Sequence, residues 1–327
     1  MKALVDALDE ISSSNNGTEA IQKSAYYGMS ESQKAKYTSE GYHAYQGKVR
    51  ELLQKDSTLY IFHTDRLTAF DKYIGMVPYK GAILSEISRF WLENVRDLIP
   101  THYQEAINER VLKVRSCTPI KAEVIVRGYM AGSMQRAYKK GIRELCGCQL
   151  PEGLSDFQRL PEPIITPTTK AAAFEHDEES SPAELISQGV CSQEEWETIS
   201  AMALKLFARG QKVYEEKGWI LVDTKYEFGR DEDGQIIVID EIHTPDSSRL
   251  WVKESYIPRL EAGEEPEMLD KEIVRRFLIK AGFSGEGKVP DVPPETLISL
   301  SKVYLKVAET LTGMQLQTHL SPEHVSI

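Results

Sequence analysis

The segment LVDTKYEFGRDEDGQIIVIDE, residues 221–241, combines strand-forming residues with charges that an ordinary buried strand lacks. Two apolar-rich runs flank Asp233–Gly234, a dipeptide typical of the turn in a β-hairpin, so we expect a hairpin with a two-residue turn. Side chains alternate along a strand, so Asp223, Lys225 and Glu227 share one face. The opposite, core-facing side holds Val222, Thr224, Tyr226 and Phe228.

A two-residue turn would place Glu227 directly opposite Asp240, with Cβ atoms roughly 5 Å apart. Two carboxylates placed in this way repel each other unless a cation lies between them. Mg²⁺ is typically held by one or two carboxylates together with substrate phosphates, and Lys225 would then reach a phosphoryl oxygen. The alternative is a solvent-facing strand in which Lys225 neutralises its acidic neighbours, and a longer turn would break the pairing.

The segment HTPDSSRLW, residues 243–251, follows at once. Pro245 ends the strand, and Asp246 belongs to a run of residues that favour turns. Arg249 has the planar guanidinium that binds a phosphate or carboxylate through two hydrogen bonds. An ordinary polar turn is the alternative interpretation.

Composition limits the classes of function. The chain has 327 residues, enough for two sub-domains, and its net charge of −11 argues against a general nucleic-acid or anionic-membrane surface. No apolar run approaches the roughly 20 residues of a membrane helix. The N-terminus does not resemble a signal peptide. Cys146 and Cys148 lack the partners of a zinc site, so reduced thiols and a cytoplasmic location are expected.

In the first half of the chain, residues 1–11 predict a short helix, and the polar residues 18–40 indicate a peripheral extension. Short strands are expected between Tyr42 and Met76. A helix over residues 81–99 should follow and end at Pro100. Two more strands are expected, at residues 110–117 and 122–130.

The second half begins with residues 146–183, which are rich in proline and predict a long loop of the kind that is usually functional or disordered. Ser192 and Glu195 form a capping box, and the apolar spacing that follows predicts a helix stopping at Gly218. Two helices at residues 270–281 and 294–312 are each followed by a glycine.

The segment GFSGEGKV, residues 282–289, nearly matches the phosphate-binding P-loop, but Val289 replaces the Mg²⁺-binding hydroxyl residue. A helix precedes it where a strand is required, and PDVPP follows it where a helix should start. We therefore interpret the segment as a glycine-rich turn between helices.

Seven motifs follow one another along the chain: GKVRELL (47–53), TDRLTAFD (64–71), AEVIVRGYMAGS (122–133), PEPIITPTTKA (161–171), EHDE (175–178), LVDTKYEFG (221–229) and DEIHTPDSSRLW (240–251). In this order they resemble the family of SAICAR synthetase (phosphoribosylaminoimidazole-succinocarboxamide synthase), a ligase of purine biosynthesis. The likeness departs at residues 172–174, Lys121 and His243, of which the first touches a substrate loop. Residues 1–40 lie outside it.

The resemblance implies an α+β fold of two lobes. A kinase-like ATP-binding lobe would span residues 41–120, and a larger α+β lobe that binds substrates and metal would span residues 121–327, after an extension at 1–40. The implied reaction joins CAIR, a carboxylated aminoimidazole ribonucleotide, to the amine of L-aspartate and yields SAICAR, ADP and phosphate. ATP, CAIR, L-aspartate and Mg²⁺ are the implied partners, without nucleic acid or membrane; the oligomeric state stays open.

The resemblance also implies roles for single residues. Gly47, Lys48 and Val49 correspond to ATP-binding positions, with Lys48 near the phosphates. Glu227 and Asp240 correspond to Mg²⁺ ligands at the ATP site. Lys225 corresponds to a lysine at the reacting phosphoryl group. The adenine pocket would lie around residues 112–117.

The substrate side has its own set of residues. Arg127, Ser133 and Arg249 correspond to groups that hold the CAIR phosphate and carboxylate, although Ser133 alone is also a candidate helix cap. Asp246 corresponds to an acid at the imidazole ribonucleotide. The other implied substrate-binding residues are Asp71, Lys170, His176 and Asp177.

A carboxylate is a poor electrophile, so we expect ATP to activate CAIR through an acyl phosphate that the aspartate amine attacks, with closure of the lobes excluding water. A concerted reaction is the alternative. Two other classes of protein compete with the ligase: a small-molecule kinase that stops at phosphorylation, and a non-catalytic nucleotide sensor. Retention of Lys48, Lys225, Glu227 and Asp240 argues against the sensor.

Overall fold

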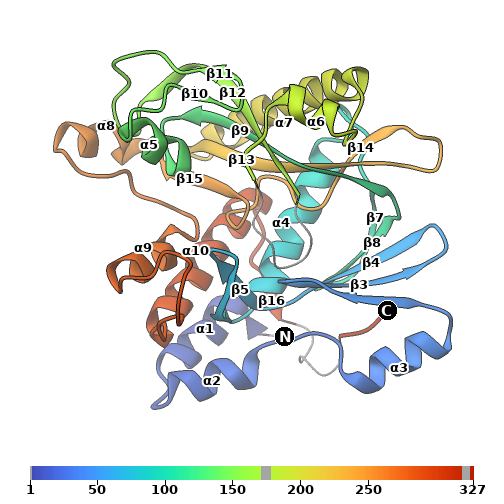
Figure 1. The fold of residues 1–327 in the computed structure, drawn as a ribbon. Helices are drawn as coiled ribbons and strands as arrows, with labels where there is room; N and C mark the ends of the chain where they lie inside the picture. Colours follow the sequence, from blue (N-terminus) through green and yellow to red (C-terminus); the bar gives the residue numbers. More distant parts are fainter. Residues whose placement is uncertain (1, 171–177, 319–324) are drawn as a thin grey trace. The chain divides into compact units, whose positions relative to one another are not determined.

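The computed structural model describes residues 2–170, 178–318 and 325–327, and the chain forms two compact units that both mix helices and strands (Figure 1). Unit 1 comprises Met1–Glu93, Tyr103–Ser116 and Leu269–Ile327, and unit 2 comprises Asn94–His102 and Cys117–Met268. The α+β fold class is confirmed. The step from Ser116 to Cys117 lies close to the expected boundary at residue 120, whereas the segment from Leu269 onward groups with unit 1.

Unit 1 is built on a five-stranded antiparallel sheet in the order β2-β3-β4-β8-β7. Its strands are β2 (His43–Gln46), β3 (Arg50–Lys55), β4 (Thr58–His63), β7 (Tyr103–Asn108) and β8 (Val111–Arg115). Leu53 and Phe62 are buried against Tyr26, Met29 and Tyr37. These last three come from the polar N-terminal segment for which the sequence predicts a peripheral extension, so the segment contributes to the core of unit 1.

The helices of unit 1 are α1 (Leu4–Ser12), α2 (Gly17–Ser24), α3 (Glu31–Ser39), α4 (Lys80–Asn94), α9 (Glu272–Lys280) and α10 (Pro294–Thr312). The sequence predicts α1, α4, α9 and α10, whereas α2 and α3 fall in the N-terminal segment for which it predicts only a peripheral extension. α10 ends at Gly313 in the left-handed conformation, as expected for a helix followed by glycine. α4 ends at Asn94 rather than at the predicted residue 99, because the chain continues in turns from residue 95.

A small hairpin and a strand pair complete unit 1. β5 (Arg66–Ala69) pairs with β6 (Lys72–Met76) across the turn Phe70–Asp71, whose residues both have positive φ. Positive φ at both central residues is typical of a type I′ hairpin turn. β1 (Lys2–Ala3) pairs with β16 (Gln317–Thr318). Residues 282–289 lie in a turn between α9 and α10, in agreement with our interpretation of the P-loop-like motif.

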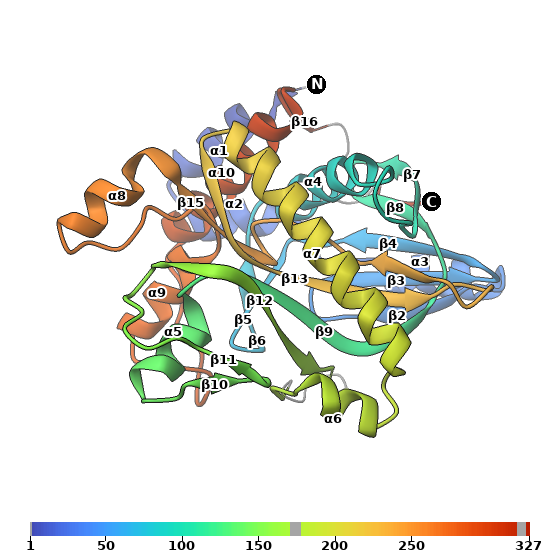
Figure 2. The ribbon, with the colours of Figure 1, turned by 90° about the horizontal axis from the view of Figure 1, so that it is seen from above.

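Unit 2 contains a second five-stranded sheet, in the order β12-β9-β13-β14 with β15 also paired to β13. Its strands are β9 (Thr118–Tyr129), β12 (Arg159–Thr169), β13 (Trp219–Arg230), β14 (Ile236–Ile239) and β15 (Ser248–Val252). The long helix α7 (Gln193–Glu216) lies over one face of this sheet (Figure 2). Its smaller elements are α5 (Gly132–Lys139), β10 (Glu144–Leu145), β11 (Cys148–Gln149), α6 (Pro182–Ser187) and α8 (Lys253–Glu261).

Helix α7 packs against β13 and β9. Val222, Thr224, Tyr226 and Phe228 are all buried, as expected, but Asp223 and Glu227 are buried as well. The alternation is interrupted at Val222, because the β13–β15 register shifts between Leu221 and Asp223 and Val222 packs in a cluster with Tyr129 and Trp251. α7 begins at the expected capping box, where Ser192 and Glu195 exchange hydrogen bonds, and the chain turns at Gly218 with a φ of 78°. The other face of the sheet is therefore available for the charged residues.

The predicted loop at residues 146–183 is wrong in part, because it contains β12. Pro161, Pro163 and Pro167 misled the prediction, since proline cannot donate a ladder hydrogen bond. β12 is the strand at the edge of the sheet, next to β9, and edge strands tolerate proline. The register also shifts between Arg159 and Ile164, at the first two prolines.

Among the described residues, no helix is both long enough and apolar enough to cross a membrane.

The contact between α7 and the sheet gives the first prediction. A Cβ atom at Gly210 would lie 2.7 Å from Leu221 Cδ2 and 2.8 Å from His243 Cε1. His243 is fixed there, because its Nε2 is 2.6 Å from the Tyr226 hydroxyl. Gly210→Ala should therefore lower the free energy of unfolding by about 1–3 kcal/mol, measured by urea denaturation, despite the better helix propensity of alanine.

The matched control is Lys205→Ala on the exposed side of the same helix, which should change the unfolding free energy by less than about 0.5 kcal/mol. A Gly210→Ala protein as stable as the unsubstituted chain would contradict this close packing.

Candidate active site

The turn of the β13–β14 hairpin corrects the predicted register. Arg230 pairs with Ile236, and the Asp231 amide donates to the Gln235 carbonyl at 3.0 Å, so the loop between them is Glu232–Asp233–Gly234. The Asp231 carboxylate accepts from the amides of Asp233 and Gln235 at 3.1 and 2.9 Å, which stabilises the longer loop. Gly234 has a φ of 79°, as hairpin loops with a glycine bulge require.

The longer loop moves Glu227 opposite Ile239, so the predicted direct opposition of Glu227 and Asp240 is wrong. Asp240 lies just after β14, half-buried, with a φ of 64° that takes the chain out of the strand conformation. Its role as a metal ligand therefore cannot be deduced from strand pairing and stays a prediction.

The acid that does face Glu227 comes from β9. Glu123 and Glu227 are direct partners in the β9–β13 ladder. The ammonium of Lys225 lies between them, 2.6 Å from Glu123 Oε1 and 2.9 Å from Glu227 Oε1. Two like charges directly opposed on a sheet repel each other, so the ammonium of this lysine offsets the repulsion between the two carboxylates.

A second lysine completes this charged group. Lys170, just after β12, forms an ion pair with Oε2 of Glu227. Burial opposes ionisation of Glu227, but Lys225 and Lys170 together bring its pKa down to about 2. Burial likewise disfavours the charged form of Lys225, but Glu227 and Glu123 outweigh this effect and raise its pKa. We call Glu123, Lys170, Lys225 and Glu227 the lysine–glutamate cluster.

Further along the same face, two arginines surround one acid. Asp223 is the ladder partner of both Arg127 and Arg249. Its Oδ2 lies 2.6 Å from Nη1 of Arg249 and 3.7 Å from Nη1 of Arg127. Burial lowers the pKa of Arg127, and the carboxylate of Asp223 acts in the opposite direction. One carboxylate thus meets two guanidinium groups, and Glu179 also acts electrostatically on Arg127.

Arg127 is held by polar groups on two further elements. Its Nε donates to Thr166 Oγ1 at 2.8 Å, and its Nη2 donates to Ser133 Oγ at 3.1 Å. Ser133 is not a helix cap, because α5 begins one residue earlier, after Ala131. A Cβ at Gly132 would lie 2.5 Å from Arg249 Nη2, so this glycine allows the guanidinium to reach the start of α5.

The turn after β14 adjoins the lysine–glutamate cluster. The Ser247 carbonyl accepts the Lys225 amide at 3.2 Å, and the Thr244 hydroxyl donates to Glu241 at 2.6 Å. Asp246 lies within this turn, half-buried, next in sequence to Ser247. Asp246 therefore lies in the segment whose backbone is hydrogen-bonded to the backbone of Lys225.

The GKVR motif lies in unit 1. The Lys48 ammonium is 2.9 Å from Asp71 Oδ1, so two residues predicted separately form an ion pair. The Gly47 amide donates to the Arg50 carbonyl at 2.8 Å, and the Val49 carbonyl accepts from the Thr64 hydroxyl at 2.6 Å. The motif is thus a tight turn leading into β3.

Some predicted residues are not placed in a site. His176 and Asp177 lie outside the described residues, as do residues 172–174. The adenine pocket at residues 112–117 also stays a prediction.

Sequence reasoning missed Glu123, Thr166 and the pairing role of Asp223. Glu123, Ile125 and Arg127 follow the same alternation that identified the charged face of β13, and this signal was present in AEVIVRG. What the sequence does not provide is the register between β9 and β13. Without the register, the direct opposition of Glu123 and Glu227 cannot be known.

The carboxylates of this face are candidate ligands for Mg²⁺. Among residues 2–170, 178–318 and 325–327, no three His, Cys, Asp or Glu side chains gather as a metal site. Mg²⁺ often has only one or two carboxylate ligands, because phosphates and water supply the rest. Glu227 is ionised and already binds a cation, Lys170, whose side chain is 40% exposed. Its carboxylate therefore fits the chemistry of a Mg²⁺ ligand.

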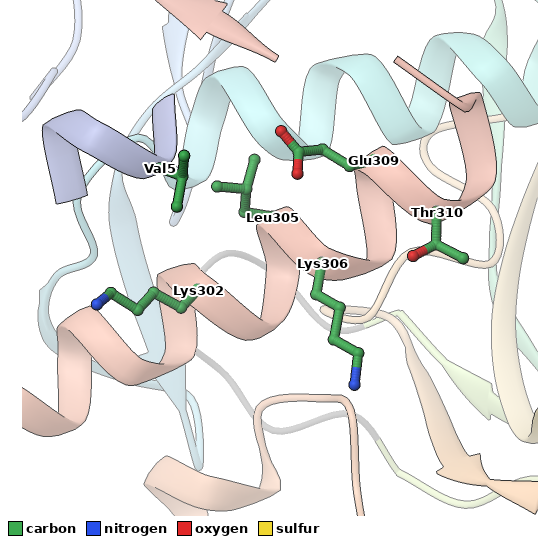
Figure 3. A pocket seen from close by; sticks show the side chains of 6 residues that line it. All are labelled: Val5, Lys302, Leu305, Lys306, Glu309 and Thr310. Atoms are coloured by element: carbon green, nitrogen blue, oxygen red, sulfur yellow. The ribbon is translucent and has the colours of Figure 1, made fainter. Parts of the chain in front are cut away.

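A surface pocket in unit 1 is a poorer candidate. Figure 3 shows its lining, formed by Val5 of α1 and by residues of α10. The α10 residues are Lys302, Leu305, Lys306, Glu309 and Thr310. Lys302 is engaged by Asp9 at 2.6 Å. These are side chains of a groove between helices, so we place the candidate active site on the charged sheet face.

Known proteins are similar to this chain in sequence and in fold. The family model for SAICAR synthetase matches residues 43–292. Phosphoribosylaminoimidazole-succinocarboxamide synthase from Bacteroides fragilis is 44% identical over 273 residues, covering 82% of this chain and 87% of the relative. The enzyme of that name from Legionella pneumophila is 42% identical over 274 residues, covering 82% and 87%.

Solved structures of known proteins are also similar to this chain in fold. SAICAR-synthase from Saccharomyces cerevisiae complexed with SAICAR has a TM-score of 0.72 and 32% identity, covering 85% of this chain and 97% of that one. A SAICAR synthetase in complex with ADP has a TM-score of 0.66 and 26% identity, covering 84% and 100%.

The low pKa of Glu227 predicts a dependence of stability on pH. Its folded-state pKa of about 2 lies below the ordinary value of 4.5, so its ion pairs stabilise the fold above about pH 4.5 and are lost as the pH falls toward 2. The difference in unfolding free energy between the unsubstituted protein and Glu227→Gln should therefore shrink by roughly 3 kcal/mol across this window.

Urea titrations at a series of pH values measure this difference. Glu216→Gln, on the exposed end of α7, is the control and should show no such change. If the difference in unfolding free energy between the unsubstituted protein and Glu227→Gln is constant from pH 6 to pH 2.5, the ion-paired state of this carboxylate is contradicted.

Proposed function

The chain belongs to the SAICAR synthetase family, and we propose that the charged face of its unit 2 sheet is where it activates a carboxylate with ATP. As a member of this family, it is a carbon–nitrogen ligase of purine biosynthesis. It joins CAIR and L-aspartate to form SAICAR while ATP is converted to ADP and phosphate.

The observation that carries the assignment of the site is Lys225 held between Glu123 and Glu227. A lysine with a raised pKa stays protonated, so it serves as a fixed positive charge rather than as a base. Such a charge stabilises a phosphoryl group in transfer. The paired acids keep it in place, because one ammonium satisfies both at 2.6 and 2.9 Å.

The arginine pair supports binding of CAIR on the same face. Arg127 and Arg249 share Asp223, and the Arg127 guanidinium also reaches Ser133 at the start of α5. Planar guanidinium groups bind phosphates and carboxylates through paired hydrogen bonds, and a helix N-terminus favours an anion. These groups would hold the CAIR phosphate and carboxylate, with Asp246 at the imidazole ribonucleotide.

Mg²⁺ would be held by Glu227 and Asp240. When bound, Mg²⁺ would neutralise charge on the phosphates of ATP. Lys170 would leave Glu227 for this to happen. Its side chain is 40% exposed, so it has solvent into which to move.

The proposed reaction has two steps. A carboxylate oxygen of CAIR attacks the γ-phosphorus of ATP, the bond to ADP breaks, and an acyl phosphate forms. The neutral amine of L-aspartate then attacks the acyl carbon, phosphate leaves with the bonding electron pair, and the amine loses a proton to solvent. Lys225 would offset charge on the transferred phosphoryl group in the first step.

Lys48 supplies the second proposed contact with ATP. Its ion pair with Asp71 is partly exposed, and a phosphate would compete with that carboxylate for the ammonium. The backbone at Gly47 and Val49 forms the turn that presents Lys48. We place the adenine near residues 112–117, and Lys170, His176 and Asp177 near the substrates.

A cytoplasmic location is supported by the cysteines. Cys146 and Cys148 are both thiols, and each lies near a backbone carbonyl, that of Pro167 at 3.5 Å and that of Ile165 at 3.4 Å. Proteins of reducing compartments keep their cysteines in this form.

The assignment of the acids predicts the effect of removing their charge. Glu227→Gln and Asp240→Asn should each lower kcat by about 10²-fold or more while the protein stays folded. Release of ADP is measured with CAIR and L-aspartate present and with each omitted in turn. Glu232→Gln in the exposed hairpin loop is the control and should retain full activity.

Near-normal turnover in both variants would contradict the proposed Mg²⁺ ligands. Phosphorylation of CAIR as the final product, without amide formation in the presence of aspartate, would favour the small-molecule kinase instead.

The role of Arg249 predicts a selective effect on one substrate. Arg249→Ala should raise the KM for CAIR by roughly tenfold or more, because a charge-assisted contact is lost, and should change the KM for aspartate little. Steady-state kinetics with each substrate varied separately test this expectation. Arg259→Ala in α8 serves as the control, and an unchanged CAIR KM in Arg249→Ala would exclude the proposed contact.

A further inference from the structure

We propose that Arg66 is a positioning residue for the ATP-binding turn at residues 47–50, and that the N-terminal segment 26–29 supports it in this task. The inference rests on the proposed role of Lys48 at the ATP phosphates. All residues concerned belong to unit 1.

The guanidinium of Arg66 uses each of its nitrogens on this turn and its surroundings. Nε donates to the Lys48 carbonyl at 3.2 Å, and Nη2 donates to the carbonyls of Gly47 at 3.2 Å and Arg50 at 3.3 Å. Nη1 donates to the Tyr27 carbonyl at 2.5 Å and lies 3.4 Å from Glu51 Oε1. A guanidinium has five N–H donors, so the contacts match its full capacity.

The remaining carbonyl of the turn is held by a neighbour of Arg66. The Thr64 hydroxyl donates to the Val49 carbonyl at 2.6 Å. Thr64 and Arg66 therefore engage every carbonyl of residues 47–50. Carbonyl oxygens repel phosphate oxygens, and a carbonyl fixed on a donor cannot rotate toward the phosphates. The turn thereby keeps a conformation compatible with an anionic ligand.

The backbone and the side chain of Lys48 both contact the hairpin that contains β5. Its backbone carbonyl accepts from Arg66, the first residue of β5, while its ammonium contacts Asp71 in the turn that follows β5. Displacing Arg66 would therefore shift the starting point of the Lys48 side chain relative to its partner. This double contact distinguishes a positioning role from a general contribution to stability.

The N-terminal segment reaches the same group of residues. The Tyr27 carbonyl accepts from Arg66, and the Met29 amide donates to Glu51 Oε2 at 2.7 Å. The amide of Tyr26 donates to Asp65 at 2.8 Å, and its carbonyl accepts the Asp65 amide at 2.9 Å. These residues precede position 43, where the match to the family model begins.

Gly28 lies in close contact with the side chain of Glu51. Its φ is 132°, and a Cβ there would lie 2.3 Å from Glu51 Oε1. Glu51 is 2% exposed and has little room to move. A side chain at position 28 would therefore displace the carboxylate that sits beside Arg66, without altering Arg66 itself.

The experiment compares Arg66→Lys and Gly28→Ala with Lys48→Met and with the control Arg89→Lys. Arg89 in α4 also forms a fork, with Glu86, and its other contact is with Glu93 of the same helix. For each protein we would measure kcat, the KM for ATP, CAIR and aspartate, the Kd for MgADP by calorimetry, and thermal unfolding.

Arg66→Lys keeps the positive charge but loses the forked hydrogen bonds of the guanidinium. It should therefore raise the KM for ATP and the Kd for MgADP by roughly tenfold. Gly28→Ala should raise both in the same direction. The KM for CAIR and for aspartate should stay within about twofold, and Arg89→Lys should leave all constants unchanged.

If Lys48→Met weakens ATP and MgADP but Arg66→Lys and Gly28→Ala change only thermal unfolding, the positioning role is overturned while the proposed role of Lys48 stands. If Lys48→Met leaves ATP binding unchanged, the role of the turn fails, and this inference fails with it. If Arg66→Lys does not fold, Gly28→Ala decides by the same criterion.

Discussion

The site on unit 2 depends on one ammonium group between two directly opposed carboxylates. Glu123 and Glu227 face each other across adjacent strands, and Lys225 lies within 2.9 Å of both. Without that lysine, the two opposed carboxylates, of which that of Glu227 is buried, would destabilise the sheet that carries them. The same carboxylates keep Lys225 protonated, so the contacts that stabilise the sheet also fix a positive charge on this face. The ion pairs of Lys225 thus stabilise the sheet and also hold the positive charge that we propose for catalysis.

The sequence predicts the composition of this face but not its pairing. Alternation along residues 221–229 places Asp223, Lys225 and Glu227 together, because side-chain direction is a local property of a strand. The partner of Glu227 depends on loop length and on β9, a strand far earlier in the chain. Asp231 favours the longer loop, since its carboxylate accepts hydrogen bonds from the amides of Asp233 within the loop and Gln235 just after it. Local turn statistics favour Asp-Gly as a two-residue turn and miss this competing interaction.

The other differences between sequence and structure have similar causes. Helix ends were predictable at Ser192 and Gly313, where a cap residue acts through neighbours in sequence. β12 was not, because whether a strand tolerates Pro167 depends on its being at the sheet edge. The N-terminal segment looked peripheral because it is polar overall, yet Tyr26, Met29 and Tyr37 supply its buried contacts. A few well-placed side chains outweigh average composition.

The charges of the lysine–glutamate cluster indicate how ligands would enter. Its two lysines and two glutamates balance, so no buried charge lacks a partner before ligands bind. A phosphate approaching Lys225 or a divalent cation approaching Glu227 would exchange one ionic partner for another, which avoids the large cost of uncovering a buried charge. Lys170 is the partner best able to leave, because its side chain is 40% exposed whereas that of Glu227 is 7% exposed. At the proposed site, ligand entry would therefore be an exchange of ion pairs that begins with Lys170, the most exposed member of the cluster.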